Sequence, residues 1–344
     1  MHRRQFNRHL MVGALASLAG TAAVGVQNFA SLRKPARLKT GDLVGLITPG
    51  SYISDESLQK AVQNIESLGF RVKLSPHIRE QRGFIAGEDR QRLDDLHGMF
   101  ADKEVAAVWC ARGGYGCSRL LPAIDYRLIA QNPKVLIGYS DVTALLQAVF
   151  LQTGLVGFHG PVAASDFTDY TKAQLSAVLI EGKAGHLIAP AEGNLAEVKP
   201  AYQPFLITPG TAQGPLMGGN LSLLAALAGT PYHADVAGKL LFIEEVGEKP
   251  YRVDRMLTQL RQAWPLQRAA GIVLGIFEDC EPKEGDLSLS LPDTLHDRLG
   301  DLGIPVAYGF SFGHISHQCT LPIGIPATMD TRHLTITLTE PAVA

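Results

Sequence analysis

The stretch VLIGYSDVTALLQAVF, residues 135–150, places a serine where an apolar run passes into a helix-like segment. Residues 135–137 are typical of a buried strand, and the segment from Thr143 onward is typical of an apolar helix. Ser140 therefore has two interpretations. As a helix N-cap, its hydroxyl would accept one free backbone N–H and do no chemistry. As a nucleophile, it would stand on a sharp turn above the sheet, where the Asp141 N–H at the start of the helix meets a developing oxyanion.

A serine is a weak nucleophile without a general base, so the rest of the chain must supply one. His314 follows a glycine in the loop-like stretch FSFGHISHQ, and His317 lies three residues further on. A histidine pair can bind a metal ion, but this pair is in a loop and no third ligand accompanies it. Glu244 and Glu245 follow the apolar run at residues 240–243. By themselves, these two carboxylates also fit a solvated turn.

A glycine-rich turn follows an earlier strand-like run. The sequence ARGGYG, residues 111–116, frees the backbone to bend and to present its N–H groups, as an anion-binding nest does. It lacks the Gly-Lys-Ser/Thr ending of a phosphate loop, so it does not indicate a nucleotide site. Such turns also serve packing alone. We therefore expect no cofactor and no metal.

The chain has four cysteines, and their spacing matches no zinc site. Cys110 and Cys117 are the nearest pair, and a disulfide between them depends on a geometry that the spacing does not give. We favour the interpretation that all four are small buried residues, the other two being Cys280 and Cys319.

The elements that must position these residues alternate along the chain. Strand-like runs are separated by helix-like segments, with strands at residues 43–47, 71–74, 106–109 and 135–137 and the clearest helices at 57–68 and 89–100. Single helices between strands predict a parallel sheet with helices on both faces. Ligands bind such sheets beyond the carboxyl ends of the strands, where Ser140 and the glycine-rich turn both lie.

Composition limits the classes of function. The 344 residues are 46% hydrophobic and 19% charged, which is typical of a globular protein long enough for two domains. The formal net charge is −2, and no basic run marks a nucleic-acid surface. The sequence therefore indicates no nucleic-acid partner and favours a small-molecule or peptide substrate.

The first thirty residues differ from the rest. Arg3-Arg4-Gln5-Phe6 precedes an uncharged apolar stretch, rich in Ala and Gly, at residues 10–26, and this pattern resembles a twin-arginine export signal. We interpret residues 1–30 as such a signal and expect a periplasmic protein. The alternative is an uncleaved membrane anchor, for which the stretch is about the minimum length and only weakly hydrophobic.

Five ordered motifs resemble the serine LD-carboxypeptidases, a family that includes the muramoyl-tetrapeptide carboxypeptidases and the microcin-immunity peptidases. They are Arg112-Gly113-Gly114-Tyr115-Gly116, Gly138-Tyr139-Ser140-Asp141, Gly218-Gly219-Asn220-Leu221, Leu241-Phe242-Ile243-Glu244-Glu245 and Phe312-Gly313-His314. The resemblance runs from about residue 44 to residue 338. It implies an α/β protein with an N-terminal parallel-sheet, Rossmann-like domain, a C-terminal β-rich α/β domain and an active site in the cleft between them. We place the nucleophile domain at residues 38–168, a linker at 169–205 and the C-terminal domain, with the glutamate and histidine, at 206–340.

The resemblance assigns a catalytic triad. Ser140 matches the nucleophile, His314 the general base, and Glu244 the carboxylate that orients the base. Because successive side chains of a strand point to opposite faces, only one of the two glutamates can meet His314, and the resemblance selects Glu244. We expect Glu245 at the cleft edge, in solvent or making an accessory hydrogen bond.

The oxyanion hole follows from the same match. We expect it to combine the N–H of Asp141 with an N–H of Gly113 or Gly114, from the glycine-rich turn. Two donors from separate turns would then point to the place where the tetrahedral oxygen forms.

The resemblance implies a substrate and a reaction. Family members cleave murein tetrapeptides between the L-centre of diaminopimelate and a terminal D-alanine through an acyl-enzyme, and homodimers match the family. Their usual setting is cytoplasmic recycling, from which the export signal departs. Two alternatives remain. One is an amidase of the same fold that acts on a peptidyl nucleotide or another acyl-amine conjugate; the other is a non-enzymatic periplasmic binding protein, which would not need Ser140, Glu244 and His314.

Overall fold

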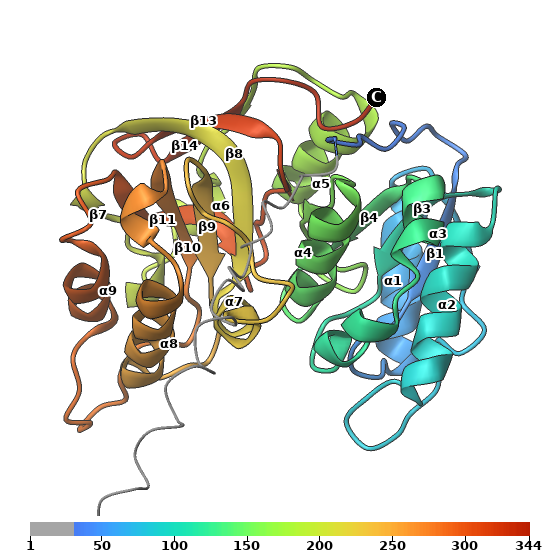
Figure 1. Ribbon diagram of the computed structural model, residues 1–344, viewed down its shortest axis with the longest axis horizontal. Coiled ribbons are helices and arrows are strands. Elements are labelled where there is room, and N and C mark those ends of the chain that lie inside the picture. The colour runs from blue at the N-terminus through green and yellow to red at the C-terminus, as the bar shows by residue number, and fades with distance from the viewer. Residues whose placement is uncertain (1–30) are drawn as a thin grey trace, which may run out of the picture.

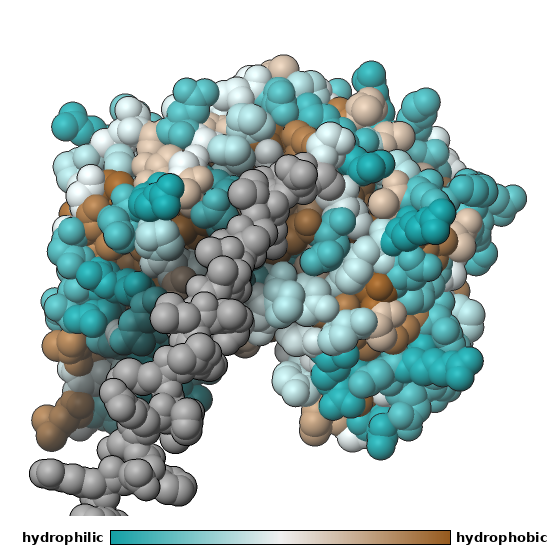
Figure 2. Space-filling model, in the orientation of Figure 1, coloured by the Kyte–Doolittle hydropathy of each residue, from teal (hydrophilic) through white to brown (hydrophobic). Residues whose placement is uncertain are grey.

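The computed structural model describes residues 31–344, and the expected export signal at residues 1–30 lies outside them. Two sheets organise the described part of the chain, one in each half of the molecule (Figure 1). Hydrophilic side chains cover most of the face shown in Figure 2, and apolar ones lie there in small groups. No helix of residues 31–344 is both long and apolar enough to cross a membrane.

Six strands form the first sheet, in the order β12-β5-β4-β3-β1-β2. Their bounds are β1 Leu43–Ile47, β2 Arg71–Leu74, β3 Val105–Cys110, β4 Val135–Gly138, β5 Phe158–His159 and β12 Leu321–Pro322. β1 to β5 are parallel, and β12 runs antiparallel to β5. The helices between them are α1 Asp55–Ser67, α2 Asp89–Ala101, α3 Tyr126–Gln131 and α4 Val142–Thr153. The predicted alternation of strands and helices is therefore confirmed.

The parallel arrangement brings three strand ends to one edge. Trp109 of β3 pairs with Ile137 of β4, and Gly138 of β4 pairs with His159 of β5. Because the strands run in the same direction, the segments that follow β3, β4 and β5 leave the sheet side by side. The glycine-rich turn, Ser140 and His159 thus lie at the same edge.

Eight strands form the second sheet, in the order β6-β14-β13-β8-β9-β10-β11-β7. Their bounds are β6 His186–Ile188, β7 Phe205–Thr208, β8 Thr211–Asn220, β9 Leu240–Glu244, β10 Gly271–Ile276, β11 Val306–Gly313, β13 Pro326–Asp330 and β14 Thr335–Leu338. The central four strands, β8 to β11, are parallel, and the outer ones are antiparallel. The helices of this half are α7 Leu221–Leu227, α8 Pro250–Ala263 and α9 Leu291–Leu299.

Two segments join the halves. The stretch expected to be a linker, residues 169–205, contains α5 Asp169–Leu175, a π-helical turn at Ser176–Ile180, the strand β6 and α6 Glu192–Leu195. β12 comes from the C-terminal half of the chain but pairs with β5 of the first sheet. The architecture is a two-domain α/β fold, and the predicted fold class is confirmed.

Strand β9 shows how alternation divides the second sheet between two cores. Leu241 and Ile243 pack in one core with residues of α8 and α9, whereas Leu240 and Phe242 pack in the other, which is continuous with the first sheet. Since side chains two residues apart share a face, Glu244 at the end of β9 lies on the same face as Phe242. That face is the one turned toward the first half of the molecule.

Helix α4 links the two sheets, and Figure 1 shows it between β4 and the α7 region. The Gln147 side chain donates from Nε2 to the Gly218 carbonyl at 2.6 Å, and Thr143 Oγ1 accepts the Asn220 N–H at 3.0 Å. Both side chains are buried, so these bonds are shielded from water. They hold the helix that begins just after Ser140 against the sheet that carries Glu244.

Candidate active site

Ser140 lies in the turn between β4 and α4, and its backbone is left-handed, with φ 62°. This conformation costs about 1–3 kcal/mol for a residue other than glycine, and such strain gathers at functional sites. Helix α4 has Asp141 as its N-cap residue, and no side chain caps it. Ser140 therefore does not have the capping role considered for it. A strained strand-to-helix turn is instead typical of a nucleophilic serine.

The amide groups around this turn are free to bind an anion. The buried Asp141 side chain accepts the Cys117 N–H at 2.8 Å through Oδ2, which ties the start of α4 to the residue that follows the glycine-rich turn. Within residues 31–344, the N–H groups of Gly113, Gly114 and Asp141 donate to no acceptor. Unpaired donors from two adjoining turns can stabilise a tetrahedral oxyanion.

Gly113 lies directly against the serine turn. A Cβ atom added to Gly113 would lie 3.0 Å from Cβ of Ser140 and 3.3 Å from the amide nitrogen of Asp141. Gly114 has φ +94°, and a Cβ there would lie 2.4 Å from Oγ of Ser51. Glycine is therefore required at position 114, where a side chain would displace the loop that carries Ser51, and a methyl group at position 113 would press on the serine turn.

Glu244 and His314 form a buried pair. Glu244 ends β9 and is completely buried, and His314 is the residue that follows β11. Nδ1 of His314 lies 2.8 Å from Oε2 of Glu244, and the His314 side chain is 20% exposed. With the carboxylate ionised, Nδ1 carries the proton and donates it to Oε2. The opposite ring nitrogen, Nε2, is then the basic one.

Opposing influences set the charge of this pair. Burial opposes ionisation of Glu244, but the charge and hydrogen bond of His314 outweigh it and hold the pKa of Glu244 below its ordinary value. Burial also works to lower the pKa of His314, yet Glu244 outweighs this and the pKa of His314 is raised. The carboxylate therefore stays ionised at neutral pH and stabilises an imidazolium when His314 takes up a proton.

Glu245 points to the other side of the strand, as alternation predicts. Its Oε2 accepts the Ser222 N–H at 2.8 Å and the Ser222 hydroxyl at 2.7 Å, and its Oε1 accepts from Nδ2 of Asn220 at 3.0 Å. The side chain is only 2% exposed, so of the two roles expected for Glu245 the solvated one is wrong, whereas hydrogen bonding is what the structure shows. Its hydrogen bonds instead hold the first turn of α7, and burial raises its pKa.

The strand end that carries Ser140 lies beside His314. The rings of Tyr139 and His314 meet edge-on, with 4.8 Å between their centroids. In the described structure His314 hydrogen-bonds Glu244 and not Ser140, and catalytic bonds of this kind often tighten only when substrate is bound. A cavity of about 260 Å³ adjoins His314 and is also lined by Tyr139, Ser165 and Asp166. The structure therefore brings the three predicted triad residues into one region.

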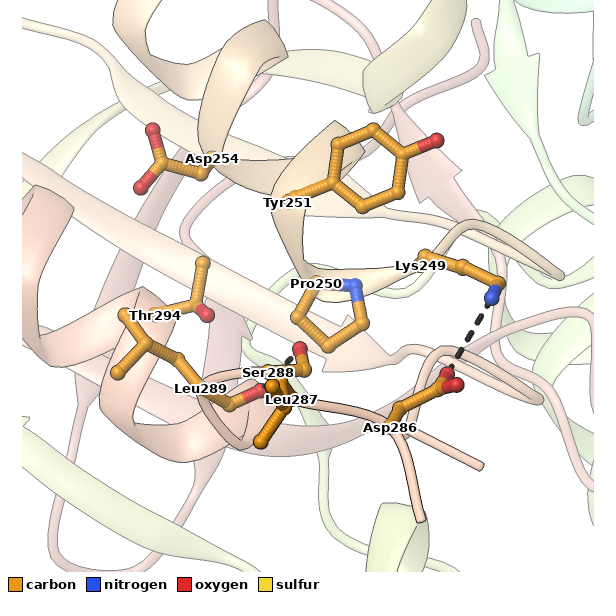
Figure 3. Close-up of a pocket in the computed structure, with 9 residues that line it drawn as sticks. All are labelled: Lys249, Pro250, Tyr251, Asp254, Asp286, Leu287, Ser288, Leu289 and Thr294. Atoms are coloured by element: carbon orange, nitrogen blue, oxygen red, sulfur yellow. Dashed lines mark hydrogen bonds and ion pairs between the residues drawn. The ribbon is translucent and has the colours of Figure 1, made fainter. Parts of the chain in front are cut away.

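A second cavity, of about 580 Å³, lies between the start of α8 and the loop before α9 (Figure 3). Among the residues that line it, Nζ of Lys249 lies 3.2 Å from Oδ2 of Asp286. None of the nine residues that line it belongs to the predicted triad. This groove is therefore separate from the site at His314.

His317 and the four cysteines are the remaining residues that the sequence singled out. His317 lies 3.1 Å from the Thr168 hydroxyl through Nδ1, and residues 31–344 contain no group of three or more His, Cys, Asp or Glu able to hold a metal ion. All four cysteines are free and buried, as the favoured interpretation of them states.

His159 is a further residue of this region that the sequence motifs did not indicate. It ends β5 next to β4, and it is 1% exposed in a box of aromatic rings beside Tyr139. Its position in the sequence could have indicated it. His159 comes at the end of the apolar run Leu155-Val156-Gly157-Phe158, much as Ser140 comes shortly after the apolar run of β4.

A strained serine turn, free amides and a buried Glu–His pair between two α/β domains are typical of a serine hydrolase. Residues 44–160 match the LD-carboxypeptidase N-terminal domain, and residues 213–329 match the LD-carboxypeptidase C-terminal domain. The chain therefore belongs to the LD-carboxypeptidase family, as the resemblance predicted, and it is an enzyme of that family.

Individual relatives agree with this assignment. The chain is 42% identical to a probable murein peptide carboxypeptidase of Bacillus subtilis over 307 residues, covering 88% of this chain and 93% of that one. It is 36% identical to the murein tetrapeptide carboxypeptidase of Pseudomonas aeruginosa, covering 85% and 94% of the two chains. The crystal structure of an MccF-like protein from Bacillus anthracis is 30% identical, with a TM-score of 0.76 and coverage of 89% and 99%.

Proposed function

We propose that this protein is a serine carboxypeptidase that removes the terminal D-alanine from murein tetrapeptides, by cleaving the amide bond after the L-centre of diaminopimelate. The names of the Bacillus and Pseudomonas relatives support this substrate class. The observation that carries the chemistry is the bond from His314 to a completely buried Glu244, next to the strained turn of Ser140. Burial of a carboxylate is costly unless a partner compensates for it, and here the partner is a histidine whose Nε2 has no hydrogen-bond partner among residues 31–344.

The mechanism assigns one role to each triad member. Nε2 of His314 accepts the proton of the Ser140 hydroxyl as Oγ attacks the carbonyl carbon before the D-residue. The tetrahedral intermediate collapses, and the amine of D-alanine leaves with the proton from His314. Water, activated by the same ring, then hydrolyses the acyl-enzyme. Glu244 keeps the proton of the neutral ring on Nδ1 and stabilises the imidazolium.

The oxyanion of both tetrahedral intermediates would meet the N–H of Asp141 and an N–H of Gly113 or Gly114. These donors have no acceptor in the described structure, and Gly113 and Asp141 adjoin Ser140. Donors that are already in place require no reorganisation when the charge develops, which is why they lower the barrier.

Gly113→Ala tests this oxyanion hole. We expect kcat to fall by about 10- to 100-fold, because the new methyl group meets Ser140 and moves a donor away from the oxyanion. The measurement is kcat on the tetrapeptide, together with a thermal melt. Gly98→Ala is the matched control, since a Cβ at that position of α2 meets nothing within 4 Å and should leave kcat unchanged. Equal rates for the two variants would remove the glycine-rich turn from the mechanism.

The reaction itself is tested with defined muropeptides. The purified protein is incubated with tripeptide, tetrapeptide and pentapeptide forms, and the products are weighed by mass spectrometry. We expect loss of a single D-alanine from the tetrapeptide alone. Release of an alanine from the pentapeptide, with the tetrapeptide unchanged, would contradict the proposed stereochemistry.

A second candidate is an amidase of the same fold that cleaves a peptidyl nucleotide or another acyl-amine conjugate. The similarity to an MccF-like protein supports it. An aminoacyl sulfamoyl nucleotide, offered beside the tetrapeptide, separates the two candidates by which amide is cleaved. A binding protein would retain either compound without cleaving it.

We also propose that the protein is exported to the periplasm by residues 1–30. The arginine pair before a mildly apolar stretch supports this assignment. Changing Arg3 and Arg4 to lysine should leave the protein in the cytoplasm, because the twin-arginine system recognises the arginine pair. Cell fractionation and immunoblotting measure the outcome, with Arg8→Lys as control. Periplasmic recovery of the double variant at the wild-type level would show that the signal was misread.

A further inference from the structure

His159 carries a buried imidazole that the mechanism does not use. Its side chain is 1% exposed, and neither Nδ1 nor Nε2 has a hydrogen-bond partner among the described residues. A buried ring nitrogen without a partner costs free energy, and such groups are rare in folded proteins. An apolar side chain of similar size would avoid this cost, so the presence of a polar imidazole at this position requires an explanation.

Three aromatic rings surround His159. The distances between ring centroids are 6.1 Å to Tyr139, 5.2 Å to Phe242 and 6.2 Å to Phe312, and all three contacts are edge-to-face. Tyr139 belongs to the first half of the molecule, whereas the two phenylalanines belong to β9 and β11 of the second sheet. His159 therefore lies where the two halves meet.

Each of these three rings is a near neighbour of a triad member. Tyr139 directly precedes the serine in the chain, Phe242 precedes the triad glutamate by two residues, and Phe312 precedes the triad histidine by two. Residues two apart on a strand share a face, so the glutamate follows Phe242 on the face that His159 packs against. His159 thus lies on the side of β9 that carries Glu244, near enough to Glu244 and His314 to feel their charges.

Glu244 has an unsatisfied atom in the same place. Its Oε2 accepts from His314, but its Oε1 is buried and has no hydrogen-bond partner among the described residues. A carboxylate oxygen accepts hydrogen bonds, and a neutral imidazole always has one N–H to donate. An orphan acceptor and an orphan donor thus lie within one enclosure.

We propose that His159 is a positioning residue, whose neutral ring donates an N–H to Oε1 of Glu244 in the working enzyme and so keeps Oε2 directed at His314. This inference rests on the proposed triad. A carboxylate held at both oxygens cannot rotate, and a charge-assisted hydrogen bond of this kind is stronger than a neutral one. The role resembles that of the residues that orient metal-binding histidines, which act through another side chain and touch no substrate.

The charge state of the ring agrees with this role. Burial lowers the pKa of His159 to about 4, and the nearby His314 adds to the effect while Glu244 opposes it. The ring is therefore neutral at physiological pH and presents one donor and one acceptor. The titratable groups that face His159 are Tyr139, Glu244 and His314, and those that face His314 also include Glu245 and, at the cavity rim, Asp166 and Lys60.

The test replaces His159 by phenylalanine, which fills the enclosure without a donor, and by glutamine, which restores an N–H. For His159→Phe we expect kcat to fall by about 10- to 100-fold with KM nearly unchanged. Without the hydrogen bond to Oε1, the negative charge of Glu244 interacts more strongly with the His314 ring. The pKa of His314 should therefore rise. The acid limb of kcat/KM should therefore move upward, by about half a pH unit. His159→Gln should recover part of both changes.

The same variants are also assayed without the proposed substrate. A fluorophosphonate probe labels an activated serine, and peptide mass spectrometry identifies the labelled residue. Failure of the wild type to label at Ser140 and to cleave the tetrapeptide would overturn the triad itself. If the wild type labels and His159→Phe labels equally fast with an unmoved pH profile, the positioning role is overturned while the triad stands. If His159→Phe does not fold, the test uses His159→Gln instead. A folded His159→Gln protein with less than one hundredth of the wild-type kcat and an unchanged pH profile would also overturn the positioning role.

Discussion

Ser140→Ala should lower kcat on the tetrapeptide by at least about three orders of magnitude and leave the fold intact. Without Oγ, no acyl-enzyme forms, and any residual rate comes from water attacking a carbonyl that the free amides still polarise. Alanine should accept the left-handed backbone of this position as well as serine does, since both carry a Cβ. Thermal melting should therefore give an unchanged Tm.

The matched control for this variant is Ser67→Ala. Ser67 lies at the end of α1 with its hydroxyl bonded to the Asn64 carbonyl, far along the chain from the site and exposed to solvent. It should keep kcat within about twofold, as surface substitutions usually do. A Ser140→Ala protein that is folded and retains a tenth of the wild-type rate would show that another group is the nucleophile.

Glu244→Gln should lower kcat by at least about three orders of magnitude as well. The neutral amide no longer stabilises the imidazolium, and if its NH₂ faces His314 it favours the wrong tautomer. The pKa of His314, now raised by Glu244, should fall, because the neighbouring charge has gone. Steady-state kinetics measures the rate, and a pH titration of the His314 ring by NMR measures the pKa.

Glu245→Gln is the contrasting variant. Its carboxylate accepts four N–H or O–H groups, from Asn220, from the amide and hydroxyl of Ser222, and from the Val246 amide. The side-chain amide of a glutamine at position 245 would turn its NH₂ group toward some of these donors, and two donors cannot hydrogen-bond each other. We therefore expect a lower Tm. The cost in kcat of the folded protein should be about tenfold or less. A larger kcat loss at Glu245 than at Glu244 would reverse the assignment, and equal losses would mean that both carboxylates act.

Much of the fold could be predicted because the signals are local. Residues 135–137 and 240–243 are continuous apolar runs, and such runs form strands that are buried on both faces of a parallel sheet. The opposite orientation of Glu244 and Glu245 follows from the two-residue period of a strand and needs no knowledge of the partner. The grouping of Ser140, Glu244 and His314 came from motifs of a known family, not from spacing.

Other features depended on contacts between distant parts of the chain. Glu245 is buried because α7 brings Ser222 against it, and nothing in the sequence around residue 245 specifies that neighbour. β12 lies in the C-terminal half of the sequence, yet it completes the first sheet beside His159. No local sequence pattern predicts either feature.

The sequence alone therefore determined the apolar central strands, such as those at residues 43–47, 135–137 and 240–243, and the faces to which their side chains point, since these follow from the spacing of apolar residues. Only the tertiary structure decided the surroundings of each buried charge. The bond from His314 to Glu244 joins residues 70 positions apart, and His159 reaches the same enclosure from a third segment. The pKa and hydrogen bonding of a buried group are set by whatever packs against it, and that depends on the path of the whole chain.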